Sequence, residues 1–61
     1  MIYAGSIVAI ENDEEIEHRV VVVKAQSEDE ANEICLQIGK IIYPDREIYT
    51  AVLLIPKEYT Q

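Results

Sequence analysis

The chain has 61 residues, with twelve Asp and Glu against five Lys and Arg, so its formal net charge is −7. A domain of this size buries only about 60% of the surface of its unfolded chain, which leaves little room for an enclosed active site. The acidic balance opposes direct binding to a nucleic-acid backbone, which requires clustered basic residues. We therefore expect one domain, residues 1–61, that is not an enzyme and does not bind nucleic acid directly.

The composition also bears on the cellular compartment. The chain has one cysteine, Cys35, so an intrachain disulfide is excluded. The N-terminal residues contain neither the pattern of a signal peptide nor an apolar run that could span a membrane. We therefore expect a cytoplasmic protein with no membrane partner, in the host cytoplasm if a phage encodes it.

The first expected strand covers residues 2–10 and is rich in β-branched side chains. Its two alternating rows are both largely apolar, which is typical of a strand buried on both faces and so of a central strand. Gly5 in its interior predicts a bulge or the close approach of another backbone.

A strongly acidic segment follows in residues 11–17. The Asn12–Asp13 dipeptide favours a turn, so we expect the loop of a β-hairpin here. The calcium loop of an EF-hand needs Gly at its sixth position and Glu at its twelfth, and this segment has neither, so no metal or cofactor is expected. Its five carboxylates are a solvated turn or a docking patch: Glu11, Asp13, Glu14, Glu15 and Glu17.

Two further strands are expected at residues 17–25 and 48–55. The earlier strand contains four consecutive valines, with His18 and Arg19 at its start and Lys24 near its end. The later strand is apolar on both rows and ends at Pro56, after a polar loop that contains Arg46. Residues 57–61 form a polar tail that is either disordered or folded over a sheet edge.

Between these strands, residues 28–42 carry the signals of a helix. Ser27 and Glu30 have the spacing of a capping box, the first turn is acidic, and Pro44 disfavours helical geometry beyond residue 42. One apolar stripe has helical spacing: Ala31, Ile34, Cys35, Ile38, Ile41 and Ile42. A second row is either incidental or a contact line for a partner: Asn32, Leu36, Gly39 and Tyr43.

These elements predict an α+β fold of order β-β-α-β. Placing the third strand beside the first gives a three-stranded antiparallel sheet of order 2-1-3, with the helix across one face. The other face would then expose more apolar surface than monomers usually show, so we expect oligomerisation, most simply a twofold homodimer, to complete the fold. The residues expected at this oligomer interface, unless the complementary row faces outward, are Tyr3, Ile7, Val20, Val22, Tyr49 and Leu53.

The first functional hypothesis is a non-enzymatic binding or inhibitor protein that acts as a homo-oligomer and blocks a basic, nucleic-acid-binding site on a larger protein. Its size and acidity, without any motif, suggest a phage or another mobile element as its source. The residues expected to bind that partner are Glu11, Asp13, Glu14, Glu15, Glu17, Asn32, Leu36 and Tyr43.

The alternative is an oligomer that holds a nucleotide or metabolite at a subunit interface. The cationic residues that would serve it are His18, Arg19, Lys24 and Arg46. No Gly-rich phosphate loop supports this alternative.

Overall fold

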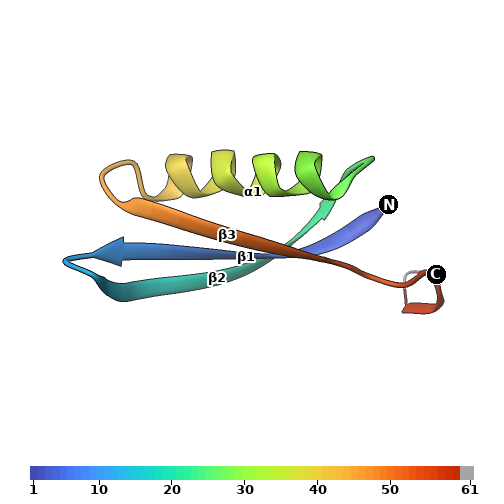
Figure 1. Ribbon diagram of the computed structural model, residues 1–61, viewed down its shortest axis with the longest axis horizontal. Coiled ribbons are helices and arrows are strands. Elements are labelled where there is room, and N and C mark those ends of the chain that lie inside the picture. Colours follow the sequence, from blue (N-terminus) through green and yellow to red (C-terminus); the bar gives the residue numbers. More distant parts are fainter. Residues whose placement is uncertain (60–61) are drawn as a thin grey trace.

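Three antiparallel strands and one helix make up the computed structural model, which describes residues 1–59 (Figure 1). The elements are β1 (Ile2–Glu11), β2 (Glu14–Lys24), α1 (Glu28–Ile42), β3 (Glu47–Leu54) and the 3₁₀ turn η1 (Lys57–Tyr59). The strand order is β2-β1-β3, and α1 lies along one face of the sheet. The predicted α+β fold and its 2-1-3 strand order are therefore confirmed. Residues 60 and 61 of the expected tail lie outside the described residues.

The hairpin between β1 and β2 is tighter than expected. Asn12 and Asp13 have φ angles of 54° and 63°, the left-handed conformation that both central residues of a type I′ turn require. This two-residue turn matches the twist of the strands, so pairing continues to Glu11 and Glu14 at its very edge. Most of the segment expected as an acidic loop is therefore strand.

One extra residue interrupts the pairing of β1 with β2. Ala9 pairs with Glu17 and Ile10 with Glu15, so Ile16 has no partner and forms a β-bulge. Because successive side chains of a strand point to opposite faces, one extra residue changes which rows of β1 and β2 share a face. Tyr3 consequently pairs with Val23.

α1 begins and ends through local interactions. The Ser27 hydroxyl accepts a hydrogen bond from the Glu30 amide at 3.2 Å, and the acidic first turn complements the helix dipole. The Glu30 carboxylate accepts from the Gln26 amide at 3.2 Å, not from the Ser27 amide that a reciprocal capping box would use. At the other end, the Tyr43 amide donates to the Gly39 carbonyl at 2.8 Å.

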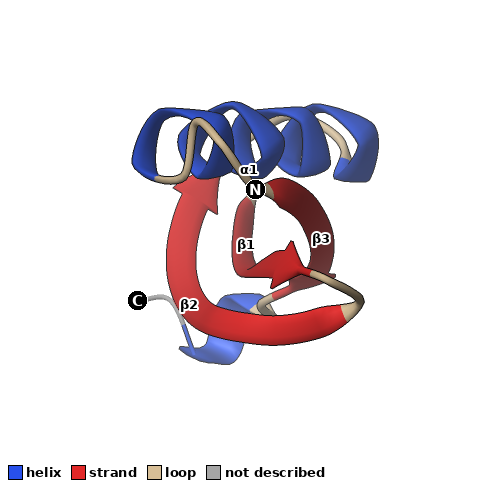
Figure 2. Ribbon diagram, turned by 90° about the vertical axis from the view of Figure 1, so that its left-hand side faces the viewer, coloured by secondary structure: helices blue, strands red, loops and turns tan. Residues whose placement is uncertain are grey.

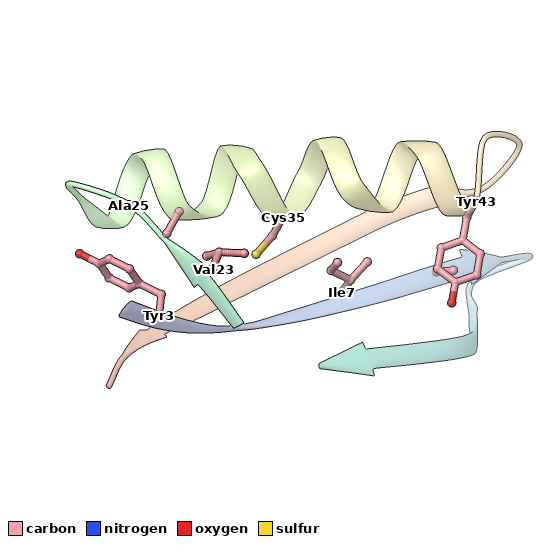
Figure 3. Packing of buried hydrophobic residues seen from close by; sticks show 8 residues of the cluster. Tyr3, Ile7, Val23, Ala25, Cys35 and Tyr43 are labelled. Atoms are coloured by element: carbon pink, nitrogen blue, oxygen red, sulfur yellow. The ribbon is translucent and has the colours of Figure 1, made fainter. Parts of the chain in front are cut away.

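The core lies between α1 and the sheet, and Figure 3 shows its side chains meeting from both sides. Cys35 and Ile7 are its largest fully buried side chains. α1 comes close to the sheet because glycines stand at two of the contacts: the Cys35 side chain lies against Gly5, and the Ile48 and Ile7 side chains lie against Gly39. The buried apolar residues are Tyr3, Ile7, Ala9, Val23, Ala25, Ala31, Cys35 and Tyr43.

Three assignments made from the sequence are wrong. Tyr3 and Ile7 face α1 and are buried, so they do not belong to the uncovered face. The second helical row does not face outward either: Gly39 and Tyr43 are buried, because Gly39 packs against Ile7 and β3. Ile41, which belongs to the apolar stripe recognised in residues 28–42, does not face the sheet and is 80% exposed.

Candidate functional site

The side of the sheet opposite α1, here called the open face, carries large exposed apolar side chains. Val20, Val22, Tyr49 and Leu53 are 70%, 68%, 57% and 73% exposed, and all four were expected at the interface. The strand register sets them in rows across β1: Val22–Ala4–Leu53, Val20–Ser6–Ala51 and His18–Val8–Tyr49. A shallow hollow of about 240 Å³ lies at the middle of this face.

The molecule is less compact than a protein of its length usually is. Its principal extents are 39 × 16 × 15 Å and its radius of gyration is 12.1 Å, against about 10.5 Å for a typical domain of this length. Its accessible surface is 4550 Å², whereas a compact monomer of this size has about 4,000 Å². The sheet and helix therefore form two layers with one outer face left uncovered.

The two ends of the open face carry opposite charges. Ile10, at the hairpin end, pairs with Glu15 on one side and Glu47 on the other. Ile2, at the far end, pairs with Lys24. The Tyr49 hydroxyl donates to the Glu47 carboxylate, and this hydrogen bond raises the pKa of Tyr49. The open face is thus apolar in the middle, negative at one end and positive at the other.

The hairpin end of the molecule concentrates the acidic residues expected to bind a partner. All five are exposed: Glu11, Asp13, Glu14, Glu15 and Glu17. Arg46 Nη1 lies 3.3 Å from Glu11 Oε1, in a pair whose side chains are both more than a third exposed. Such surface pairs contribute at most about 1 kcal/mol, and this pair neutralises one carboxylate of the five. The hairpin end therefore remains strongly negative.

On the open face, Ser6 and His18 make a contact that the sequence analysis missed. Ser6 Oγ lies 2.5 Å from His18 Nε2 across the β1–β2 pair. A nucleophile and a base at this distance are one requirement of acyl transfer. However, within residues 1–59 no carboxylate accepts a hydrogen bond from His18 to orient its ring. The backbone amides of β1 pair with the strands on both sides, so they cannot serve as oxyanion donors beside Ser6. The contact is therefore a cross-strand polar pair that only the register could reveal.

The cationic residues expected at a small-molecule site do not come together. Arg19 lies on the helix side, where its Nε donates to the Tyr43 hydroxyl at 2.8 Å and its guanidinium lies 5.9 Å from the ring centroid. The hydrogen bond to Tyr43 raises the pKa of Arg19. His18 lies on the open face, Arg46 contacts Glu11 at the hairpin end, and Lys24 lies at the opposite end. These positions do not converge on one ligand.

The helical residues expected to contact a partner are instead used within the fold. The Thr50 hydroxyl donates to Asn32 Oδ1 at 2.7 Å, which ties α1 to β3. Tyr43 is buried and holds Arg19, and Leu36 is half-buried. These contacts account for Asn32 and Tyr43 without a partner.

Across residues 1–59, no group of three or more His, Cys, Asp and Glu side chains is placed to hold a metal ion. Within the same residues, no helix combines the length and apolarity needed to cross a membrane.

Comparisons with known proteins add no assignment. No protein-family model matches the chain, and no curated protein or solved structure matches it significantly.

Proposed function

We propose that this chain is a non-enzymatic binding protein that acts as a homo-oligomer and docks its acidic hairpin end on a basic surface of a larger protein. The observation that carries the proposal is the placement of five exposed carboxylates around the two-residue turn at one end of an elongated body (Figure 1). Charge of one sign concentrated at a tip steers association with a surface of the opposite sign.

The tip is also preorganised. Asn12 and Asp13 hold a defined turn, and the strands are paired up to Glu11 and Glu14. Little backbone conformational entropy is then lost when the hairpin end meets a partner. A nucleic-acid-binding surface carries the clustered Lys and Arg that such a tip would contact, and occupying that surface would inhibit the larger protein.

The test compares two variants of equal charge in affinity capture from cell lysate at low salt. Asp13→Asn with Glu14→Gln removes two charges at the tip, and Asn is well suited to the left-handed conformation at residue 13. Glu33→Gln with Glu58→Gln removes two exposed charges away from the tip. We expect the tip variant to lose most of a captured basic protein and the control variant to keep it.

Capture that is equal in both variants, or that does not weaken with added salt, would contradict docking through the hairpin end. A captured protein should also lose its nucleic-acid binding when the chain is added, in proportion to occupancy. If binding persists at saturation, the chain is not an inhibitor of that surface.

A further inference from the structure

The open face has both apolar area and charges of both signs, and this combination indicates which partner would bind it. We propose that it stacks on the open face of a second copy of this chain, in a twofold dimer whose strands run antiparallel across the interface. This inference rests on the homo-oligomer in the proposed function and deepens it by naming the surface and the arrangement.

The middle of the open face is the part that a partner has to bury, because its large apolar side chains are exposed. Val20, Val22 and Leu53 are each about two-thirds exposed or more, and α1 lies entirely on the other side of the sheet (Figure 2). η1 lies beyond the ends of the strands, so it leaves the middle uncovered (Figure 1). A contiguous apolar patch on a small protein usually marks an interaction site, and two antiparallel sheets commonly pack face to face.

The charges distinguish a second copy from a uniformly basic partner. A basic surface would attract Glu15 and Glu47 but would repel Lys24 at the other end of the same face. When the second copy is turned end for end, Glu15 of one copy lies over Lys24 of the other at one end of the interface. The twofold symmetry repeats the same pair at the other end. The face is therefore complementary to itself, as a twofold interface requires.

The same charges distinguish the two twofold axes that could bring two open faces together, one across the strands and one along them. An axis across the strands places Val20 over Val20 of the second copy and Tyr49 over its Leu53. An axis along the strands places Glu15 over Glu47 of the second copy, which is repulsive, and Val22 over its Leu53. Like charges opposite each other are destabilising, so the antiparallel arrangement is the one we infer.

The area of the face sets the expected affinity. Three strands about 4.8 Å apart, with a rise of about 3.3 Å per residue, give about 400 Å² of flat area over the rows from Ile2 to Ile10. Specific interfaces commonly bury about 800 Å² per partner. We therefore expect a dimer with a micromolar dissociation constant, and mass must be measured over a range of concentrations.

Light scattering of two matched variants tests whether this face forms the dimer. Leu53→Asp places a charge on the open face, and Ile41→Asp places one at a similarly exposed apolar position on α1. We expect the wild type and Ile41→Asp to reach dimer mass and Leu53→Asp to stay monomeric while keeping its helical circular dichroism. A wild type that stays monomeric up to about 1 mM, or Leu53→Asp protein that still dimerises, overturns the proposal.

Cross-linking of cysteine variants in a Cys35→Ala background tests the arrangement. Packed sheets lie about 10 Å apart, a distance that a short bismaleimide spans. Because a dimer holds facing cysteines at millimolar effective concentration, Val20→Cys should cross-link to itself about tenfold faster than the exposed helical control Glu33→Cys. A mixture of Tyr49→Cys and Leu53→Cys should likewise exceed either variant alone. Preferential cross-linking of Val22→Cys to Leu53→Cys would overturn the antiparallel arrangement.

These outcomes are separate from those of the capture experiment. A monomer that still captures a basic protein through its hairpin end overturns the dimer and leaves docking through the hairpin end intact. A dimer that captures nothing overturns that docking and leaves the dimer intact.

Discussion

The Cys35 thiol of α1 lies against Gly5 of β1, in the space that a β-carbon on residue 5 would occupy. Both residues are buried, and Gly5 is on the central strand, so neither neighbour can move aside. The contact sets how closely the helix approaches the sheet over the core shown in Figure 3.

Gly5→Ala should therefore destabilise the fold. The new methyl group would overlap Cys35 Sγ and lie 3.3 Å from Val21 Cγ2, and overpacking of this kind costs about 1–3 kcal/mol. Urea unfolding at a fixed protein concentration measures the loss. Adding Cys35→Ala, which removes the sulfur, should recover part of it, so that the two losses are less than additive. Strict additivity would contradict the contact.

Gly39→Ala sets helix propensity against packing. Alanine gains about 1 kcal/mol over glycine within a helix. Here its methyl group would lie 2.7 Å from Ile48 Cγ2 and 3.0 Å from Ile7 Cγ2, and relieving such contacts costs about 1–3 kcal/mol. We expect no net gain and a loss of up to about 2 kcal/mol by difference, whereas Gln37→Ala on the exposed side should be nearly neutral. A Gly39→Ala variant more stable than the wild type would show that α1 has room to shift.

Because Cys35 is buried, the free energy of unfolding should decrease with pH in the alkaline range. Desolvation raises the pKa of the thiol in the folded chain, so the stabilisation is present at neutral pH and is lost as pH rises through the folded pKa. The free energy of unfolding should fall more steeply as the pH rises above about 8 in the wild type than in Cys35→Ala. Tyr49, whose pKa is also raised, contributes with the same sign to both proteins and cancels in the comparison. Parallel curves would contradict a buried thiol.

The bulge at Ile16 should be dispensable, whereas the paired residues of β2 should not be. Deleting Ile16 would leave Glu17 opposite Ala9 and Glu15 opposite Ile10, so every later pair would be kept and only the bulge would be lost. Deleting Val20 would instead bring Lys24 opposite Tyr3, so one of β1 and β2 would turn its buried row outward. We expect the Val20 deletion to abolish the cooperative unfolding transition, as measured by circular dichroism, and the Ile16 deletion to keep it. Cooperative unfolding of the Val20 deletion variant would show that the register can slip.

Features whose causes are local could be predicted from the amino-acid sequence. α1 spans the expected range because its cap, its acidic first turn and Pro44 act within a few residues of each end. The Asn12–Asp13 turn and the two-sided apolar character of β1 likewise indicated a hairpin and a central strand. The acidic segment was recognised from composition alone.

The rows of side chains that share a face of the sheet could not be predicted in the same way. With a two-residue turn and unbroken pairing, Tyr3 would lie opposite Val22 and would share a face with Val20 and Val22, as expected. The unpaired Ile16 shifts every later pair by one residue, so Tyr3 instead shares its face with Val23. This face is the one that α1 covers, and Tyr3 and Ile7 are buried there. On α1, Gly39 faces the sheet because its missing β-carbon admits Ile48 and Ile7. Helix signals act between residues that are close in the chain, which is why the helix was predictable. Register and close packing depend on residues far apart in the chain, which is why the composition of the open face was not.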